Sequence, residues 1–179
     1  MENKPNKVTA RITPHSIEAE QSCLGCLLLD DSAVLGIMAV LREADFYVKA
    51  HKTIFESMRE IYTANRPIDY VTLTDDLERK GVLEAVGGID YITTLTNIVP
   101  SAANYKHYVD IVKRDSMLRK LISSSQDIID KAYDGTEENV LAFAEKSIFD
   151  IAEKEDTSSL EQINESLGSV LKKFEEIDK

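Results

Sequence analysis

"NYKHYVDIVKRDSMLRKLISSSQDIIDKAYDG" (Asn104–Gly135) predicts a single long helix, which Asn104 caps at its start and Gly135 ends. About 30 residues at 1.5 Å each give a rod roughly 45 Å long, too long for the small bundle of helices before it to cover. Side chains recur along one side at steps of three and four, the period of a helix. These positions are Ile111, Asp115, Leu118, Ile122, Ser125 and Ile129.

A return helix is expected directly after the rod. Thr136-Glu137-Glu138 is typical of a helix start, and apolar residues follow at helical spacing from Val140 to Ile151. Two antiparallel helices joined by a tight turn form a helical hairpin, whose apolar face is too wide for one partner helix. We therefore expect self-association through this hairpin, and the residues expected to carry it are Ile111, Leu118, Leu121, Ile129, Leu141 and Ile148.

The C-terminal stretch predicts a separate helix. A polar break, EKEDTSS (Glu153–Ser159), precedes apolar residues that step by three or four, nearly a heptad seam. An isolated helix of this length is marginal in water, so it is expected to dock on another subunit or on a further domain. Its docking residues are Leu160, Ile163, Leu167, Val170, Leu171 and Phe174.

Shorter helices are predicted before the rod. Ser16 is expected to cap the first of them, and Asp31 or Ser32 to cap the second. The clearest carries an apolar stripe from Ile54 to Tyr62. The chain is thus expected to divide into a flexible tail (1–13), a helical head (14–100), a hairpin (101–152) and a linker with its helix (153–179).

Two features near the middle of the head bear on the fold class. Thr72 with Asp75 three residues later is typical of a capping box for a short helix that ends at Gly81. The stretch IDYVTLT (Ile68–Thr74) contains strand-forming residues, but no mate for a strand occurs, so an extended loop is expected. The fold class that follows is all-α.

Gly87 and Gly88 raise the question of a phosphate-binding loop. Such a loop needs G-x-x-x-x-G-K-[ST], and neither a lysine nor a Ser/Thr stands at the required offset. The pair therefore separates two helices. The chain also lacks H-E-x-x-H, E-x-x-H and G-x-S-x-G motifs, so no catalytic residue, metal ligand or cofactor is expected in it.

The charge balance points to protein partners. The formal net charge is -11, and the richest basic stretch is KRDSMLRK (Lys113–Lys120), which lies within the predicted rod. Affinity for nucleic acid grows with the number of phosphates that basic residues neutralise. Alone, the chain should be a protein-binding or assembling module before it is a DNA binder.

Cys23 and Cys26 have a C-x-x-C spacing, but they lie in an apolar helical run and no histidine stands at zinc-ligand spacing. We expect two small buried thiols. The N-terminus lacks the apolar region of a signal peptide, and no apolar run approaches the length of a membrane span. Together these features predict a cytoplasmic protein without a membrane partner.

Tyr91 is a candidate interface residue. In the helix after the glycines, Ile89, Ile92 and Leu95 share one face, and Tyr91 projects roughly 100° away from it. A large aromatic off the core stripe is a candidate anchor for a partner. The alternative is a tyrosine that packs on a neighbouring helix of its own domain.

Four runs of this sequence resemble the N-terminal domain of the DnaB family of bacterial replicative DNA helicases. The first three are PHSIEAEQSCLGCLLLD (Pro14–Asp30), DFYVKAHKTIFESM (Asp45–Met58) and PIDYVTLTDDLERKGVLEAVGGIDYITTL (Pro67–Leu95). The fourth is PSAANYKHYVDIVKRDSMLRKLI (Pro100–Ile122). Their order and spacing follow the family over most of Pro14–Ile151, except that Cys23 and Cys26 stand where the family usually has small apolar residues.

The resemblance implies an assembly domain of a hexameric helicase. In the family, hairpins pair between subunits and three pairs form a collar, while the linker helix docks on the neighbouring subunit's motor. That RecA-like motor carries the ATP and Mg sites and meets DNA in the full-length hexamer. Because the family's chain continues into the motor, this chain is expected to be part of a longer, ATP-dependent helicase.

The resemblance also implies partners and contact residues. The family's collar recruits the C-terminal domain of primase and responds to the helicase loader. The primase-contacting positions that match in this chain are Glu18, Tyr91, Arg119, Ile122 and Ile128, although Ile122 and Ile128 would equally serve as hairpin core.

Two other classes of protein stay open from the residues alone. One is a free-standing helical dimerisation adaptor without enzymatic activity. The other is a small helical enzyme that uses carboxylates, which would need a concave pocket holding a strongly perturbed acid.

Overall fold

The computed structural model describes residues 12–135 and 140–152 of the 179-residue chain. Its long helices are α1 (Ile17–Leu29), α2 (Asp31–Val40), α3 (Lys49–Thr63), α4 (Tyr70–Arg79), α5 (Gly88–Asn97) and α6 (Tyr105–Asp134). Short 3-10 turns occur at Glu43–Asp45, Glu84–Val86 and Ala102–Asn104, and a further helix spans 140–152. No strand occurs in the described ranges, which confirms the all-α prediction.

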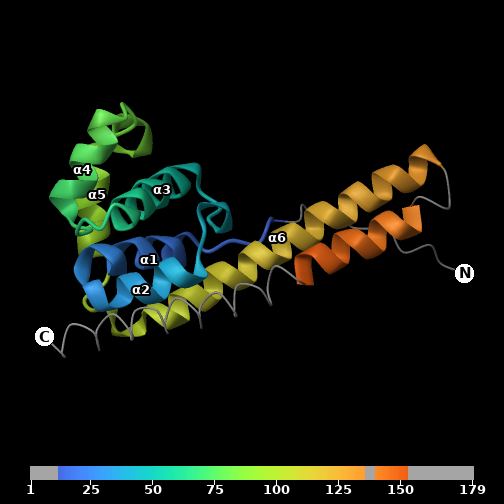
Figure 1. The fold of residues 1–179 in the computed structure, drawn as a ribbon, viewed down its shortest axis with the longest axis horizontal. Coiled ribbons are helices and arrows are strands. Elements are labelled where there is room, and N and C mark those ends of the chain that lie inside the picture. Colours follow the sequence, from blue (N-terminus) through green and yellow to red (C-terminus); the bar gives the residue numbers. More distant parts are fainter. Residues whose placement is uncertain (1–11, 136–139, 153–179) are drawn as a thin grey trace, which may run out of the picture.

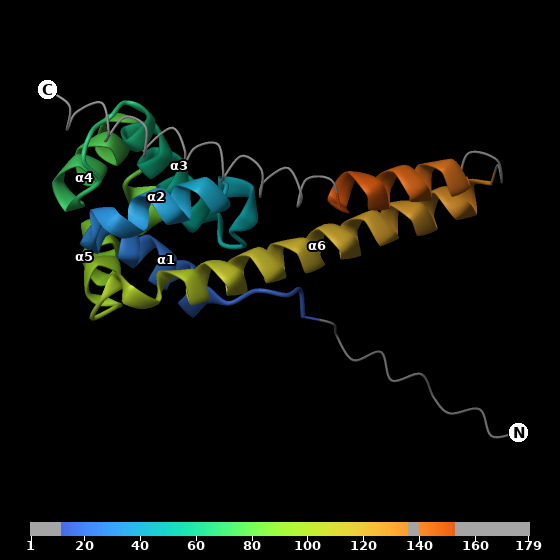
Figure 2. The same ribbon diagram turned by 60° about the horizontal axis from the view of Figure 1, so that its bottom comes forward.

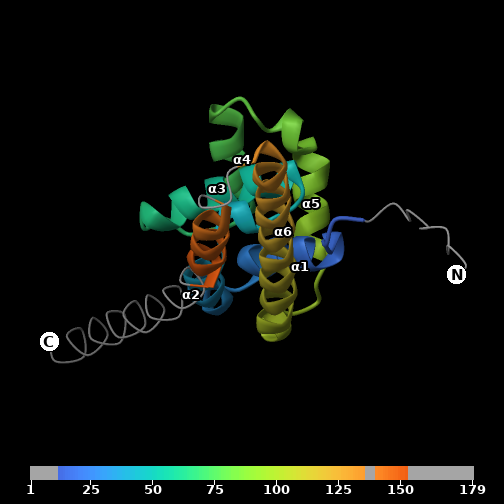
Figure 3. The same cartoon turned by 90° about the vertical axis from the view of Figure 1, so that its right-hand side faces the viewer.

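Helices α1 to α5 form a head at one end of the molecule, and α6 runs beneath α1 and α2 and then far beyond them (Figure 1). The helix over 140–152 lies beside the distal half of α6 in all three views (Figures 1, 2 and 3). Lys131 of α6 places its Nζ 4.4 Å from the ring centroid of Phe143, which ties the two helices together.

Helix α1 is the centre of the head, because its sequence is apolar nearly all round. It contacts α2, α3, α5 and α6. Gly25 lets α5 approach closely, since a Cβ there would lie 2.6 Å from the carbonyl oxygen of Leu95. The core also takes in two side chains from the start of α6, Val109 and Val112.

The distal part of α6 extends beyond the head and is not covered by it. The buried residues of this helix all lie between Val109 and Ser116, and every described position beyond is half-buried or exposed. Gly135 ends the helix in the left-handed conformation, at φ 75°, as predicted. The expectation that the rod outreaches its bundle is confirmed.

The first helix begins as predicted, because the Ser16 hydroxyl accepts a hydrogen bond from the backbone N–H of Ala19 at 3.2 Å. The cap predicted for the second helix was wrong by one or two positions. Asp30 caps α2 by accepting from the N–H of Ser32 at 2.8 Å. Residue 30 thus ends α1 and opens α2, which allows the two helices to follow without a loop.

The expected loop over Ile68–Thr74 was also wrong, because α4 begins at Tyr70. Asp69 accepts from the N–H of Thr72 at 2.8 Å, and the Thr72 hydroxyl accepts from the N–H of Asp69 at 3.0 Å. This reciprocal pair is a capping box three residues earlier than the one predicted from Thr72 and Asp75. It outweighs the weak helix preference of the strand-forming residues that follow it.

The cap predicted for the rod, Asn104, was wrong in its hydrogen bonding. The Ser101 hydroxyl accepts from the N–H of Ala103 at 3.1 Å, opening the 3-10 turn Ala102–Asn104, from which α6 continues at Tyr105. Asn104 occupies the cap position of α6 but makes no side-chain cap hydrogen bond. None of the described helices combines the length and apolar character that crossing a membrane requires.

Candidate functional site

Tyr91 lies where α1, α3 and α5 meet. Its hydroxyl oxygen is 2.5 Å from Nε2 of His51 on α3 and accepts a hydrogen bond from Nε2 of Gln21 on α1 at 3.0 Å. The Tyr91 and His51 rings are nearly parallel, with centroids 6.0 Å apart and an interplanar angle of 6°. The residue is half-buried, and its hydroxyl is held by two side chains of the same domain.

This arrangement corrects the helical-face argument made from the sequence. Ile89, assigned to the core face, is 51% exposed, while Ile92 and Leu95 are buried as expected. Tyr91 packs within its own domain, which was the alternative to an outward anchor. The reason is that a tyrosine can bury most of its ring and still satisfy its hydroxyl, here with His51 and Gln21.

Behind Tyr91, a buried carboxylate continues the hydrogen-bond chain. Glu20 accepts from the backbone N–H groups of Tyr47 and Val48, at 2.5 and 3.2 Å, and its Oε2 lies 2.6 Å from Nδ1 of His51. An acidic group at the start of a helix is favoured by the helix dipole, and these N–H groups lie directly before α3. We call the chain Glu20–His51–Tyr91–Gln21 the Tyr91 relay.

Sequence reasoning missed Glu20, Gln21 and His51. Glu20 and His51 are buried, each on the face of its helix that packs into the core. The available signal was position: Glu20 stands four residues before buried Leu24, and His51 four residues before buried Phe55. A charged or titratable residue on an apolar stripe marks a buried hydrogen-bonding site, because such groups are buried only with partners.

Arg119 joins α6 to the N-terminal stretch. It donates hydrogen bonds to the carbonyl oxygens of Pro14, at 2.9 Å, and of Asp45. Its guanidinium carbon is 5.7 Å from the ring centroid of Tyr47, and that ring stacks on His15 with centroids 4.3 Å apart. The guanidinium is therefore engaged by the chain's own residues, and only part of it faces solvent.

The structure connects two of the five predicted contact residues, which lie on α5 and α6. Tyr91 and Arg119 are linked through Glu20, because the N–H that Glu20 accepts belongs to Tyr47, whose ring lies against Arg119. Glu18 is exposed on α1, three positions before Gln21 and so on the same side of the helix.

The other two predicted contact residues follow Arg119 on α6, where Ile122 is exposed and Ile128 half-buried. Among the residues expected to carry self-association, Leu118 and Ile129 of α6 are exposed, and so are Leu141 and Ile148 of the following helix. Leu121 is half-buried, and Ile111 packs against the head core. Phe149, which is exposed, was not predicted. The six expected docking residues from Leu160 to Phe174 lie outside the described residues.

Asp45 forms a second buried polar cluster, at the corner before α3. Its carboxylate accepts hydrogen bonds from the Ser116 hydroxyl at 2.7 Å and the Arg42 N–H at 2.9 Å. Lys120 and Lys113 lie 3.2 and 3.6 Å away. Burial opposes ionisation, but these hydrogen bonds and positive charges outweigh it and lower the pKa of Asp45. The cluster fixes the corner to α6.

Both cysteines are buried thiols, as predicted. Burial raises the pKa of Cys26 to about 11, with the negative charge of Asp30 adding to the effect. Burial also raises the pKa of Cys23 well above its ordinary value, helped by Cys26 and Glu20. Because the thiolate is the reactive form, raised pKa values make both thiols poor nucleophiles at neutral pH.

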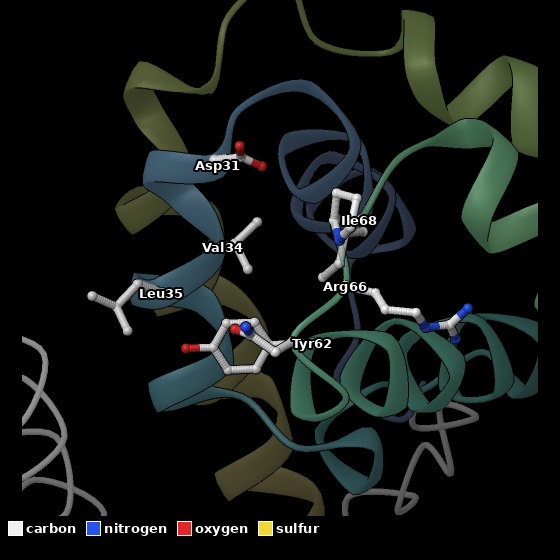
Figure 4. Close-up of a pocket in the computed structure, with 8 residues that line it drawn as sticks. Asp31, Val34, Leu35, Tyr62, Arg66 and Ile68 are labelled. Carbon is white, nitrogen blue, oxygen red and sulfur yellow. The ribbon is translucent and has the colours of Figure 1, made fainter.

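A shallow pocket of about 260 Å³ opens between α2 and the end of α3, and Figure 4 shows that the Arg66 side chain points away from it. Arg66 instead lies 3.6 Å from the buried carboxylate of Asp76. Within the described residues, no three His, Cys, Asp or Glu side chains gather as metal ligands. The pocket is lined by Asp31, Val34, Leu35, Tyr62, Asn65, Arg66, Pro67 and Ile68.

Comparison with known proteins identifies the fold and its family. The family model described as the DnaB-like helicase N terminal domain matches residues 12–114. The crystal structure of the N-terminal domain of DnaB helicase from Mycobacterium tuberculosis matches with a TM-score of 0.75 at 34% identity. That match covers 78% of this chain and 99% of the mycobacterial domain.

Two curated relatives agree with this match. The replicative DNA helicase DnaC of Bacillus subtilis is 37% identical over 169 residues, 93% of this chain and 37% of that helicase. The replicative DNA helicase DnaB of Buchnera aphidicola is 38% identical over 181 residues, 98% of this chain and 39% of that helicase. This chain thus spans less than two fifths of either relative's length. From its sequence and its fold alike, the chain belongs to the family of DnaB-like helicase N-terminal domains.

Proposed function

We propose that this chain is the assembly and recruitment domain of a replicative DNA helicase. Its hairpin, α6 with the helix over 140–152, pairs with that of a second copy, and three pairs form the collar of a hexamer. The Tyr91 surface recruits the C-terminal domain of primase, which couples priming to unwinding. The collar also responds to the helicase loader. The ATP-driven motor and its Mg site belong to the rest of the helicase, and DNA is met only by the full-length hexamer.

The observation that carries this proposal is the uncovered hairpin in a chain of this family. Exposed apolar side chains line both of its helices, including Ile122, Ile129, Leu141 and Ile148. Apolar side chains gathered on one projecting element mark a surface for association. A hairpin that is too long for its own head is suited to a second copy of itself, because a symmetric interface uses the same patch twice.

The recruitment part of the proposal has a direct test. The 179-residue chain is titrated calorimetrically with the C-terminal domain of primase from the same organism. We expect saturable binding that Tyr91→Ala weakens at least tenfold, or about 1.4 kcal/mol, in a variant that circular dichroism shows to be folded. Tyr62→Ala is the matched control, because Tyr62 is another tyrosine at the head surface, on α3.

Three outcomes are informative. Binding that Tyr91→Ala leaves untouched would contradict the assignment of the surface to α5. Binding by neither this chain nor the full-length helicase would overturn the recruitment proposal. Binding by the full-length helicase alone would mean that primase contacts more than one copy of the domain at once.

A further inference from the structure

Two polar side chains of the Tyr91 relay occupy core positions, where apolar side chains are usual. Glu20 and His51 are almost fully buried in a core that is otherwise largely apolar. Burying such groups costs stability unless every one finds a hydrogen-bond partner. Here the partners form one continuous chain, which begins at the start of α3 and ends at the half-buried Tyr91 and Gln21.

We infer that Glu20, His51 and Gln21 are positioning residues, which hold the Tyr91 ring in a fixed orientation for the docking partner. This inference rests on the proposed function of Tyr91 as a primase contact. Ordering a side chain at an interface costs affinity when the partner arrives. The relay removes that cost beforehand, because the Tyr91 hydroxyl already has two fixed partners on two different helices.

Both ring nitrogens of His51 are engaged within the domain. Nδ1 lies 2.6 Å from a carboxylate oxygen of Glu20, and Nε2 lies 2.5 Å from the Tyr91 hydroxyl oxygen. The phenol oxygen in turn accepts from Gln21. The hydroxyl is therefore hydrogen-bonded to two side chains inside the domain.

This geometry limits which part of the Tyr91 side chain a partner can contact. The imidazole of His51 is nearly parallel to the Tyr91 ring and meets it at the hydroxyl end, since the centroids are 6.0 Å apart and Nε2 is 2.5 Å from the hydroxyl oxygen. A partner would therefore contact the ring of this half-buried side chain rather than its hydroxyl. The hydroxyl then contributes to docking only indirectly, through its hydrogen bond to His51. Substitutions of Tyr91 and His51 should therefore have non-additive effects on affinity for the partner.

A double-mutant cycle tests this coupling. Tyr91→Phe keeps the ring and removes its hydroxyl, and His51→Phe keeps a ring of similar size and removes both nitrogens. We expect each single variant to weaken binding of the primase domain about three- to tenfold, and the double variant to be no weaker than the weaker single one. Such non-additivity is the signature of one shared interaction.

Ser57→Ala is the matched control for a stability effect. Ser57 is buried on the same helix as His51, and its hydroxyl accepts a hydrogen bond from Lys80 at 2.9 Å. The substitution removes a buried hydrogen bond outside the relay, so affinity for primase should stay unchanged. Should His51→Phe fail to fold, Gln21→Leu takes its place in the cycle with Tyr91→Phe, because Gln21 is half-buried.

The outcomes separate this inference from the proposed function. Wild-type binding that falls with Tyr91→Ala but not with Tyr91→Phe, His51→Phe or Gln21→Leu overturns the inference and leaves the recruitment proposal standing. Additive losses in the double variant, or an equal loss in Ser57→Ala, also overturn it. Absence of binding by both the wild-type chain and the full-length helicase overturns the two together.

Discussion

The hydroxyl of Tyr91 lies 2.5 Å from Nε2 of His51, and the two rings are nearly parallel, although the residues are 40 positions apart in the chain. The contact joins α5 to α3, and Gln21 extends it to α1. The residue proposed to contact primase is thus part of the head's internal packing. Any substitution of Tyr91 must therefore be judged on stability as well as on binding.

Tyr91→Phe should lower the free energy of unfolding by about 1–3 kcal/mol, because it leaves Nε2 of the buried His51 without its partner. Chemical denaturation followed by circular dichroism measures the change. Tyr133→Phe is the control, since Tyr133 is almost fully exposed on α6 and should lose nothing. Equal stability of the Tyr91→Phe and wild-type chains would show that the relay contributes nothing to folding.

Asp45→Asn should destabilise the chain in a pH-dependent way. The pKa of Asp45 in the folded state lies below its unfolded value of about 3.9. Its ionised form therefore contributes stability above about pH 4, and this contribution is lost as the pH falls through the lowered folded pKa. We expect a loss of about 1–3 kcal/mol at pH 7, and a smaller difference from the wild type below pH 4.

Urea unfolding at a series of pH values checks the Asp45 prediction. Asp127→Asn provides the comparison, because Asp127 is an exposed carboxylate on α6. A difference between Asp45→Asn and the wild type that stays constant from pH 7 to pH 3 would contradict the role given to the charges of Lys113 and Lys120.

The sequence predicted the helices whose signals are local and long. The rod follows from the spacing between Ile111 and Ile129, and its end from Gly135. Cap positions were less secure, because Asp30, Asp31 and Ser32 are all good cap residues and the choice depends on how α1 and α2 pack. The helix α4 was predicted, but strand-forming residues hid its start, which Asp69 fixes by accepting from the N–H of Thr72.

The candidate site was predictable only in part. Tyr91 could be singled out from one helix, because its offset from Ile92 is a property of that helix alone. Its partners His51 and Glu20 come from two other helices, and no local pattern pairs residues 40 and 31 positions apart. Arg119 likewise meets Pro14 across 105 positions. Such contacts depend on the packing of whole helices.

Gly25→Ala should be strongly destabilising for the head. The new methyl group would lie 2.6 Å from the backbone oxygen of Leu95, so α1 and α5 would have to move apart. Overpacking of this kind costs about 1–3 kcal/mol, which thermal unfolding detects. Gly36→Ala should cost less, because its methyl would meet the side chain of Tyr105, which can turn aside. The reverse order would refute the tight α1–α5 crossing.

Cys23 and Cys26 should not react with a thiol reagent in the native chain. Only the thiolate is nucleophilic, and burial raises the pKa of Cys26 to about 11 and that of Cys23 well above its ordinary value. We expect a disulfide reagent at pH 8 to modify neither residue until a denaturant is added, when both react. Fast modification without denaturant would mean that α1 opens readily.

The hairpin should drive self-association through its exposed apolar side chains. Leu141 and Ile148 are 66% and 52% exposed on the helix over 140–152. An aspartate buried in an apolar interface without a partner is strongly unfavourable. Leu141→Asp and Ile148→Asp should each raise the dissociation constant of the assembly at least about tenfold, equivalent to 1.4 kcal/mol, as measured by sedimentation velocity over a concentration series.

Val71→Asp is the control for the hairpin variants, because Val71 is 71% exposed but lies on α4 in the head. It introduces the same charge on the same chain and should leave the assembly intact. Circular dichroism of all three variants should match the wild type, since none of these side chains is buried in the head core. If Val71→Asp dissociates the assembly as strongly as Leu141→Asp, or if the wild-type chain sediments as a monomer throughout, the hairpin is not the surface through which this domain assembles.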